Sequence, residues 1–181
     1  MPRKMRFYLA YLHDWDSRLC VSINKTSQYR IINIWFRAVS RLGDGVFWYS
    51  LMLMMALFEH EQGIKPVVHM VTAGLLGTAI YKWLKTKTSR PRPYQVRQDI
   101  RLAETPLDYF SFPSGHTLHA MTFSMIAITY YPVFAVLLIP FTLMVAASRV
   151  ILGLHYPSDV LAGAGIGALI GVISFELLTL I

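Results

Sequence analysis

Residues 110–131 read FSFPSGHTLHAMTFSMIAITYY, so a short polar group leads directly into an apolar run. The run from residue 116 to residue 131 is of the kind that crosses a bilayer, which takes roughly 20 mostly apolar residues. Pro113, Ser114, Gly115 and His116 stand where this helix should begin. The stretch therefore predicts a membrane helix whose first turn carries an unusual set of polar groups.

The rest of the chain supports a membrane environment. It has 181 residues, of which 55% are hydrophobic and 15% charged, against roughly 25% charged in soluble domains. Apolar runs occupy residues 45–60, 64–84, 116–131, 132–148 and 159–181. Such runs leave no polar helix faces to meet water, which argues against a buried soluble core. The predicted fold class is an all-α, polytopic transmembrane helix bundle with five spans.

The N-terminal part differs from the rest. In residues 29–43 the apolar side chains of Ile31, Ile34 and Trp35 alternate with arginines. This pattern predicts an amphipathic helix lying at the membrane surface or, alternatively, a half-inserted sixth helix. Residues 1–28 are polar and basic, and their apolar stretch is too short and interrupted for a signal peptide. We expect an interfacial N-terminal segment at residues 1–43 and a transmembrane domain at residues 44–181.

The charge balance restricts the partners. The net charge is +7, and a chain that is both basic and apolar points to a bilayer and to anionic headgroups or phosphates rather than to nucleic acid. Cys20 is the single cysteine, so the chain has no internal disulfide and no cysteine-based metal site. No cluster of acidic residues suggests a magnesium site. The sequence therefore predicts no metal and no cofactor, and it carries no signal of an oligomeric state.

Counting membrane crossings brings the polar clusters to one face. The end of run 64–84, the start of run 116–131, the end of run 132–148 and the start of run 159–181 all meet there. The clusters at these points are Lys85 with Arg92-Pro93, then Pro113-Ser114-Gly115-His116, and then Ser148-Arg149 with His155 and Asp159.

These clusters predict a phosphate site. Lys85, Arg92 and Arg149 are cations beside a region of low dielectric, where they are costly unless an anion joins them. Arginine matches phosphate with two parallel hydrogen bonds. Ser114 and Gly115 begin a helix, and free N–H groups at a helix N-terminus favour an anion.

Two histidines supply reactive groups at the same face. His155 lies four residues before Asp159, so one turn could bring the carboxylate to one imidazole nitrogen and leave the other free to attack. His116 lies on the opposite side of this phosphate site, called the cradle below, where it could protonate a leaving alkoxide. Phosphoryl transfer needs mainly positioning and neutralisation of oxygen charge, which the cations supply without a metal.

Lys-x6-Arg-Pro, Pro-Ser-Gly-His and Ser-Arg-x5-His-x3-Asp, in this order, resemble the signature motifs of the type 2 phosphatidic acid phosphatase (PAP2) superfamily. The resemblance covers roughly residues 29–181. It implies that His155 is the nucleophile that becomes phosphohistidine, that Asp159 orients it, and that His116 is the general acid and then the base. It also implies a set of phosphate ligands: Lys85, Arg92, Ser114, Gly115 and Arg149. Larger members of the family have a six-helix core. In this chain, residues 1–28 do not predict the first helix of that core.

Several neighbouring residues are expected to be structural. Residues 90–93 read RPRP, so Arg90 is a second candidate for the arginine of the first motif, but no lysine stands seven residues before it. We therefore interpret Arg90 and Lys87 as membrane-edge anchors. His69 and His119 are expected to pack between helices. Gly163, Gly167 and Gly171 form a stripe of small residues that lets another helix approach closely.

A site at the membrane edge favours a lipid phosphate or diphosphate. The candidates are phosphatidic acid, phosphatidylglycerol phosphate, undecaprenyl diphosphate and the phosphates of lipid A, with selectivity expected from loop 94–112. The positive-inside rule favours a cytoplasmic site, whereas the resemblance favours the outer face of a bacterial inner membrane. The alternatives to a lipid phosphatase are a lipid-to-lipid phosphotransferase and a non-catalytic lipid-binding protein. A vanadium haloperoxidase is a further alternative, against which the spans argue.

Overall fold

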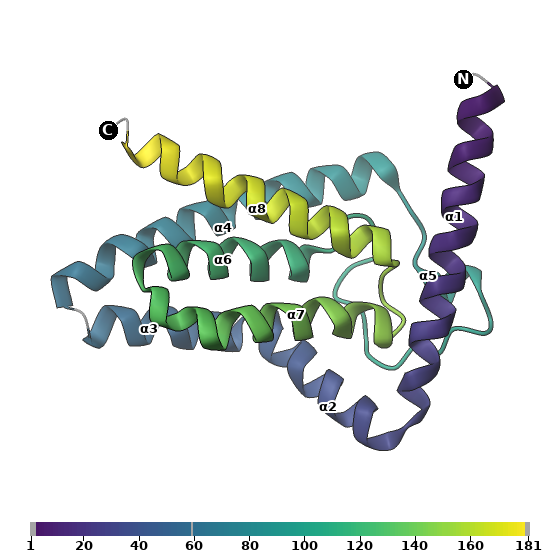
Figure 1. Cartoon of the computed structure of the whole chain (residues 1–181), viewed down its shortest axis with the longest axis horizontal. Helices are drawn as coiled ribbons and strands as arrows, with labels where there is room; N and C mark the ends of the chain where they lie inside the picture. The colour runs from purple at the N-terminus through teal and green to yellow at the C-terminus, as the bar shows by residue number, and fades with distance from the viewer. Residues whose placement is uncertain (1–2, 59, 180–181) are drawn as a thin grey trace.

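A computed structural model describes residues 3–58 and 60–179, and all regular structure in these ranges is helical (Figure 1). This confirms the all-α fold class. The elements are α1 (Arg3–Asn24), η1 (Lys25–Gln28), α2 (Arg30–Arg41), η2 (Leu42–Val46), α3 (Phe47–Phe58), α4 (His60–Thr88), α5 (Pro93–Val96), α6 (Gly115–Tyr130), η3 (Pro132–Phe134), α7 (Ala135–Ile151) and α8 (Pro157–Thr179).

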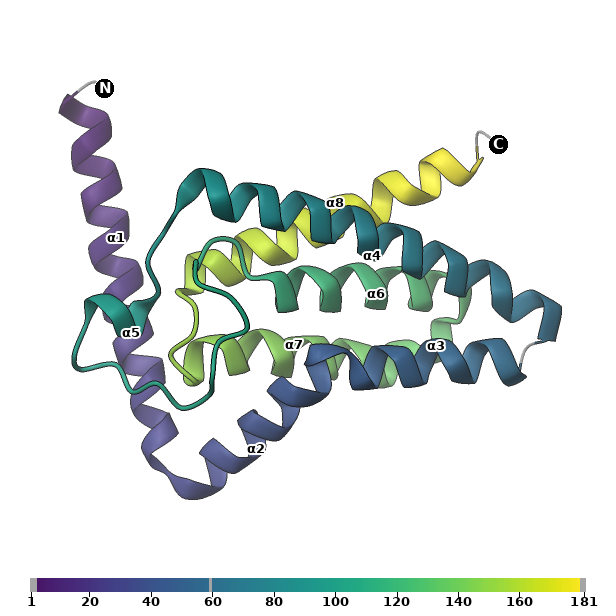
Figure 2. The same ribbon diagram turned by 180° about the vertical axis from the view of Figure 1, so that it is seen from behind.

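Helix α6 is the centre of the bundle. It packs against α4, α7 and α8, and Figures 1 and 2 show these helices running alongside it. Leu118, Ile126 and Ala127 of α6 are completely buried. The stretch that begins with Pro-Ser-Gly-His is therefore the core helix, and its N-terminal end lies among the loops at one end of the bundle.

The glycine stripe of α8 brings its backbone against α6. A Cβ atom on Gly163 would lie 2.5 Å from the carbonyl oxygen of Ser114, and one on Gly167 would lie 2.4 Å from that of Leu118. Real Cβ atoms do not approach backbone atoms so closely, so only glycine fits at these positions. The predicted close approach is confirmed, and it seats the first turn of α6.

Within the described residues, the expected apolar runs lie mainly in helices, but the lengths of these helices differ. Within the described residues, three segments are long and apolar enough to cross a membrane: Gly63–Val96, Pro132–Ile151 and Pro157–Leu177. Helix α3 has 12 residues and α6 has 16, which is short against the roughly 20 that a bilayer requires. Three of the five expected spans therefore reach full length, while α6 is enclosed by its neighbours.

The predicted amphipathic helix is confirmed as α2. Its side chains of Ile31, Ile34 and Trp35 are exposed, as a face that meets lipid headgroups would be. Between α2 and α3 lies the π-helical turn η2, in which Gly45 has a φ of 141°. This turn bends the chain, so that α2 leaves the bundle at an angle (Figure 2).

Helix α1 is an element that the sequence did not predict. It stands beside the bundle at the end where the polar loops gather (Figures 1 and 2). Its last residue, Asn24, donates from Nδ2 to the carbonyl oxygens of Ile151 (2.9 Å) and Arg101 (3.0 Å). Asn24 Oδ1 also accepts from the N–H of Arg101 at 2.8 Å. These bonds tie α1 to the end of α7 and to the long loop before α6.

Candidate active site

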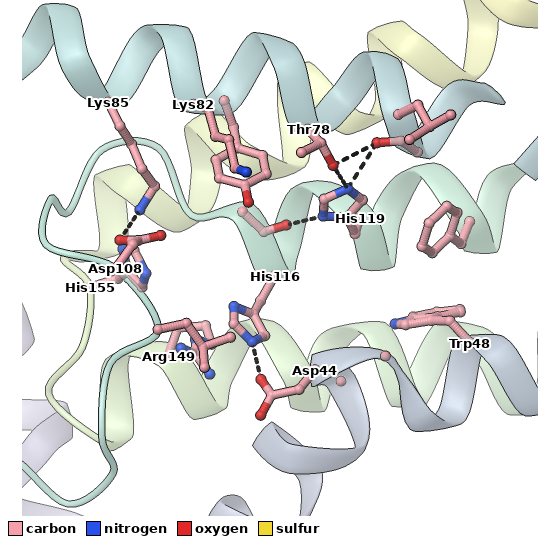
Figure 3. A pocket seen from close by; sticks show the side chains of 18 of the residues that line it. Asp44, Trp48, Thr78, Lys82, Lys85, Asp108, His116, His119, Arg149 and His155 are labelled. Atoms are coloured by element: carbon pink, nitrogen blue, oxygen red, sulfur yellow. Dashed lines mark hydrogen bonds and ion pairs between the residues drawn. The ribbon is translucent and has the colours of Figure 1, made fainter. Parts of the chain in front are cut away.

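A cavity of about 700 Å³ opens where the predicted clusters meet (Figure 3). The residues that line it come from η2, α3, α4, α6, α7 and the loops beside them. Its lining includes six of the predicted site residues: Lys85, Arg92, Gly115, His116, Arg149 and His155. The structure thus brings together residues from all three motifs, as counting the membrane crossings predicted.

The three predicted cations are buried. Lys85 is 5% exposed, Arg92 is 1% exposed and Arg149 is 2% exposed. Arg92 donates from Nη1 to the carbonyl oxygen of Leu154 at 2.7 Å, and Arg149 donates from Nη1 to Ser40 Oγ at 2.5 Å. In the described part of the chain, no carboxylate forms an ion pair with Arg149, and its Nε has no hydrogen-bond partner. A buried arginine with an incomplete set of partners favours the entry of an anion.

One carboxylate already occupies part of this positive site. Asp108 Oδ1 lies 2.7 Å from Lys85 Nζ and 2.7 Å from Arg92 Nη2. Burial alone would raise the pKa of Asp108, but the ion pair with Lys85, helped by Arg92, holds that pKa below its usual value. A phosphate oxygen would make the same charge-assisted bonds. Asp108 belongs to no motif and was not predicted, because its partners lie on α4 and in the turn after it.

The first turn of α6 presents N–H groups to the cavity. Ser114 is the N-cap, and its side chain accepts from the N–H of Thr117. The N–H of Ser114 donates to the carbonyl oxygen of Asp159 at 3.0 Å. Ser114 is fully buried and lies behind the cavity wall rather than in its lining. The next N–H groups, those of Gly115 and His116, precede the first internal bond of the helix and suit an anion.

His155 is held by the turn that follows α7. The N–H groups of Leu154 and His155 both donate to the carbonyl oxygen of Arg149 at 3.0 Å. Gly153 makes this turn with a φ of 76°, and a Cβ atom there would lie 2.6 Å from the carbonyl oxygen of Arg101. Only glycine suits both the left-handed backbone and the lack of space.

The environment of His155 favours the neutral form of its imidazole. Burial is the main cause that lowers its pKa, to about 3; Asp159 opposes this shift, and the charges of Arg92 and Arg149 add to it. His155 Nδ1 lies 3.7 Å from Asp159 Oδ2, which is longer than a hydrogen bond. That oxygen accepts instead from Ser111 Oγ at 2.5 Å and from the N–H of Tyr156 at 2.9 Å. The carboxylate therefore lies on the correct side of the ring, within a short movement of Nδ1.

His116 faces the cavity and has a carboxylate partner. Its Nε2 forms a hydrogen bond with Oδ1 of Asp44, which belongs to η2 (Figure 3). The sequence did not predict Asp44, because residues 42–46 carry no motif and their proximity to α6 depends on the bend between α2 and α3.

A model of the PAP2 superfamily matches residues 66–180, which is more than half of the chain. The chain belongs to the PAP2 superfamily. An undecaprenyl-diphosphatase of Sulfolobus acidocaldarius is 30% identical over 143 residues, covering 77% of this chain and 67% of that protein. A lipid A 1-phosphatase of Rhizobium etli is 33% identical over 116 residues, covering 62% of this chain and 48% of that protein. The chain thus spans about two thirds of the first relative and about half of the second.

Solved structures of PAP2 proteins have the same fold. The crystal structure of Aquifex aeolicus LpxE matches with a TM-score of 0.73 and 28% identity, over 88% of this chain and 93% of that one. A transmembrane PAP2 type phosphatidylglycerolphosphate phosphatase from Bacillus subtilis matches with a TM-score of 0.72 and 21% identity, over 94% of this chain and 88% of that one. The second likeness bears on the fold alone. With its apolar helices, the chain is an integral membrane protein.

Arg90 lies outside the three PAP2 motifs but contacts one of their residues. Its Nη1 lies 2.6 Å from Asp159 Oδ1, and its Nη2 lies 2.7 Å from Asp16 Oδ2 of α1. The guanidinium also stacks over the ring of Tyr156, 4.2 Å from its centroid. The prediction that Arg90 is a membrane-edge anchor is therefore wrong, because its charge is directed inward between two buried carboxylates. Lys87, by contrast, is exposed as expected.

The two histidines expected to pack between helices differ. His69 is buried and meets the rings of Tyr130 and Phe175 edge-on, which confirms a packing role. His119 also packs, but it lines the PAP2 cavity one turn beyond His116. Its Nδ1 lies 3.0 Å from the carbonyl oxygen of Gly115, and its Nε2 lies 3.1 Å from Thr78 Oγ1. His119 thus bridges the first turn of α6 to α4.

Proposed function

We propose that this protein removes a phosphate from a membrane lipid that carries a phosphomonoester or diphosphate, through a phosphohistidine on His155 and without a metal. One observation carries the proposal. The imidazole of His155 is buried at the wall of a cavity that also contains Lys85, Arg92, Arg149 and His116. A nucleophile, its charge-neutralising groups and a proton donor thus share one space.

In the first step the phosphate displaces Asp108 and accepts hydrogen bonds from the three cations and the Gly115 N–H. His155 Nε2 attacks phosphorus, so that a P–N bond forms and the bond from phosphorus to the lipid oxygen breaks. His116 gives its proton to that leaving oxygen. Asp159 approaches Nδ1 and stabilises the positive charge that develops on the ring of His155.

In the second step water replaces the lipid. His116, now neutral, takes a proton from the water while the water oxygen attacks phosphorus and the P–N bond breaks. Inorganic phosphate leaves, and His155 is neutral again. His116 regains the proton that it lost in the first step, so protons balance over the cycle.

The wall of the cavity suits an amphiphile. Beyond the charged end, α3 and α4 contribute Trp48, Met52, Val71 and Leu75 to the lining. Leu75 is 66% exposed, so the apolar part of the cavity continues to the outside of the bundle, where lipid would lie. This gradient supports a substrate whose phosphate enters the cradle while its tail stays in the bilayer. The names of the relatives, an undecaprenyl-diphosphatase and a lipid A 1-phosphatase, support the same class. An outward-facing site remains a prediction of the resemblance.

Phosphate release by the detergent-purified protein tests the function. The panel holds phosphatidic acid, phosphatidylglycerol phosphate, undecaprenyl diphosphate, lipid A and a soluble aryl phosphate, all with EDTA. We expect release from at least one lipid and its loss in His155→Ala, because the attacking nitrogen is removed. Release by His155→Ala at the wild-type rate, or release that EDTA abolishes, would contradict the mechanism. Turnover that requires a second lipid as acceptor would instead indicate phosphate transfer.

A further inference from the structure

Asp44 places a negative charge in a cavity that otherwise attracts anions. It lines the cavity with His116 and Arg149, and there it repels a phosphate. Apart from His116, its carboxylate has no hydrogen-bond partner among the described residues. A carboxylate in such a place is consistent with a role toward a cation that forms on His116.

The backbone around Asp44 is fixed by two glycines. Gly45 has a φ of 141°, and a Cβ atom there would lie 2.7 Å from the Tyr49 ring. A Cβ atom on Gly43 would lie 3.2 Å from the Val145 side chain of α7. Gly45 thus makes a kink between α2 and α3, at which the helical backbone is interrupted. The bend thus holds Asp44 toward the cavity, where Figure 3 shows its carboxylate at the ring of His116.

The contact assigns different roles to the two nitrogens of His116. Nε2 faces Asp44. In Figure 3 the other ring nitrogen points toward the side of the cavity that holds Lys85 and His155. A carboxylate on Nε2 keeps a proton on that nitrogen and stabilises the imidazolium. Nδ1 is then the nitrogen that carries the transferred proton.

We propose that Asp44 is a positioning residue for the general acid, so that the site contains a second Asp–His pair, Asp44–His116, opposite Asp159–His155. The proposal rests on the function proposed above. Asp44 holds the ring of His116 in one tautomer, favours its protonated form against the nearby cations, and lets Nδ1 donate to the leaving oxygen. Of the other charged groups, Arg149 from α7 and His119 from α6 act on the pKa of His116. The remaining titratable or charged groups that line the same cavity are Tyr49 from α3, Tyr81, Lys82 and Lys85 from α4, and Arg92, Asp108, Tyr109 and His155 from the loops.

The dependence on the leaving group separates this role from a structural tether. An alkyl phosphomonoester leaves as a basic alkoxide and needs a proton, whereas an aryl phosphate leaves as a weak base and needs it much less. The test compares kcat/KM for a lipid phosphomonoester and an aryl phosphate across pH in wild type, Asp44→Asn and Asp44→Glu. Asp99→Asn is the matched control, because among the described residues this carboxylate forms an ion pair with Arg97 alone, and both side chains are exposed.

Asp44→Asn is expected to lower kcat/KM for the lipid by about 100-fold, within the range for general acid–base catalysis, and for the aryl phosphate by less than about tenfold. The alkaline limb of the lipid profile should move to lower pH, and Asp44→Glu should restore part of the rate. Equal losses of kcat/KM for both substrates with an unchanged pH profile would mean that Asp44 only holds the structure, and this would overturn the proposal. Wild-type kinetics in Asp44→Asn would overturn it as well.

A second readout does not depend on turnover. In protein labelled with ¹⁵N-histidine, the signals of His116 are identified by their loss in His116→Gln. We expect the proton on Nε2 in the neutral wild-type ring, and a titration that moves to lower pH in Asp44→Asn. Identical titrations in the two proteins would overturn the proposal even if no substrate were turned over. If the titrations of His116 differ between the two proteins as expected but no substrate releases phosphate, the result would count against the proposed function alone.

Discussion

At the residue scale, the site depends on how Asp159 is held. The carboxylate is completely buried and accepts from Arg90, Ser111 and the N–H of Tyr156. Asp16 in turn binds Arg90 and accepts from both the N–H (2.9 Å) and the hydroxyl of Ser158 (2.5 Å). A residue of α1 thereby supports the carboxylate of Asp159, which we propose orients His155.

Arg90→Ala should therefore destabilise the protein and reduce turnover. Removing one partner of a buried ion pair costs about 3–5 kcal/mol, since the remaining charge stays unpaired. Arg90→Lys should recover part of the loss, because it keeps the charge but not the two-sided geometry. Thermal unfolding in detergent and kcat measure the two effects, with exposed Lys87→Ala as the control. Wild-type stability and kcat in Arg90→Ala would show that the network does not hold Asp159.

The residues that were predicted and those that were missed differ in one physical respect. Lys85, Arg92, His116, Arg149 and His155 belong to local patterns whose spacing is visible along the chain. Asp44, Asp108, Asp16 and Arg90 act through pairs that exist only in the fold, such as Asp44 and His116, which are 72 positions apart. A single charged residue in a loop or turn carries no sign of such a partner.

At the element scale, the loop before α6 covers the cradle. Asp108 of this loop forms ion pairs with Lys85 and Arg92, so a phosphate that binds these cations must displace its carboxylate. Asp108→Asn should therefore bind orthovanadate, a phosphate mimic, several-fold more tightly, because the competing charge is gone. The inhibition constant of wild type, Asp108→Asn and the control Asp99→Asn measures this. Unchanged or weaker inhibition in Asp108→Asn would mean that the carboxylate is not a competitor.

The contact between α8 and α6 makes a second prediction at this scale. Gly167→Ala should destabilise the protein by about 1–3 kcal/mol, because the new Cβ atom overlaps the backbone of α6. Gly165→Ala is the matched control, since no atom lies within 4 Å of its added Cβ. Its stability should be equal or slightly higher, as alanine favours a helix. Thermal unfolding in detergent compares the two, and equal effects would contradict the packing.

Apolar runs predicted the helices α3, α4, α6, α7 and α8, while α1 was missed. The reason is physical. Charged residues interrupt the apolar residues of helix α1. The helix is fixed by hydrogen bonds of Asn24 and Asp16 and by a small apolar cluster in which Cys20 packs with Val150 and Tyr156. Hydropathy detects burial in lipid or core, but it does not detect a helix docked through hydrogen bonds and ion pairs.

At the scale of the whole molecule, charge and apolar surface are separated along the bundle. The motif residues gather at one end, as counting the crossings predicted, and the apolar part of the cavity runs from there along α3 and α4. The lengths of the spans could not be predicted as well. Helices α3 and α6 are shorter than a bilayer requires, because α6 is shielded by its neighbours and α3 continues the bent run from α2.

The central claim is that phosphate passes through a covalent bond to His155. In the most direct measurement, the detergent-purified protein turns over a ³²P-labelled lipid phosphate in the presence of EDTA. The reaction is quenched rapidly without acid, and the labelled residue is then mapped. The account predicts an alkali-stable, acid-labile label on His155 that is absent from His155→Ala. Steady phosphate release with no labelled protein, or a label on another residue, would contradict it.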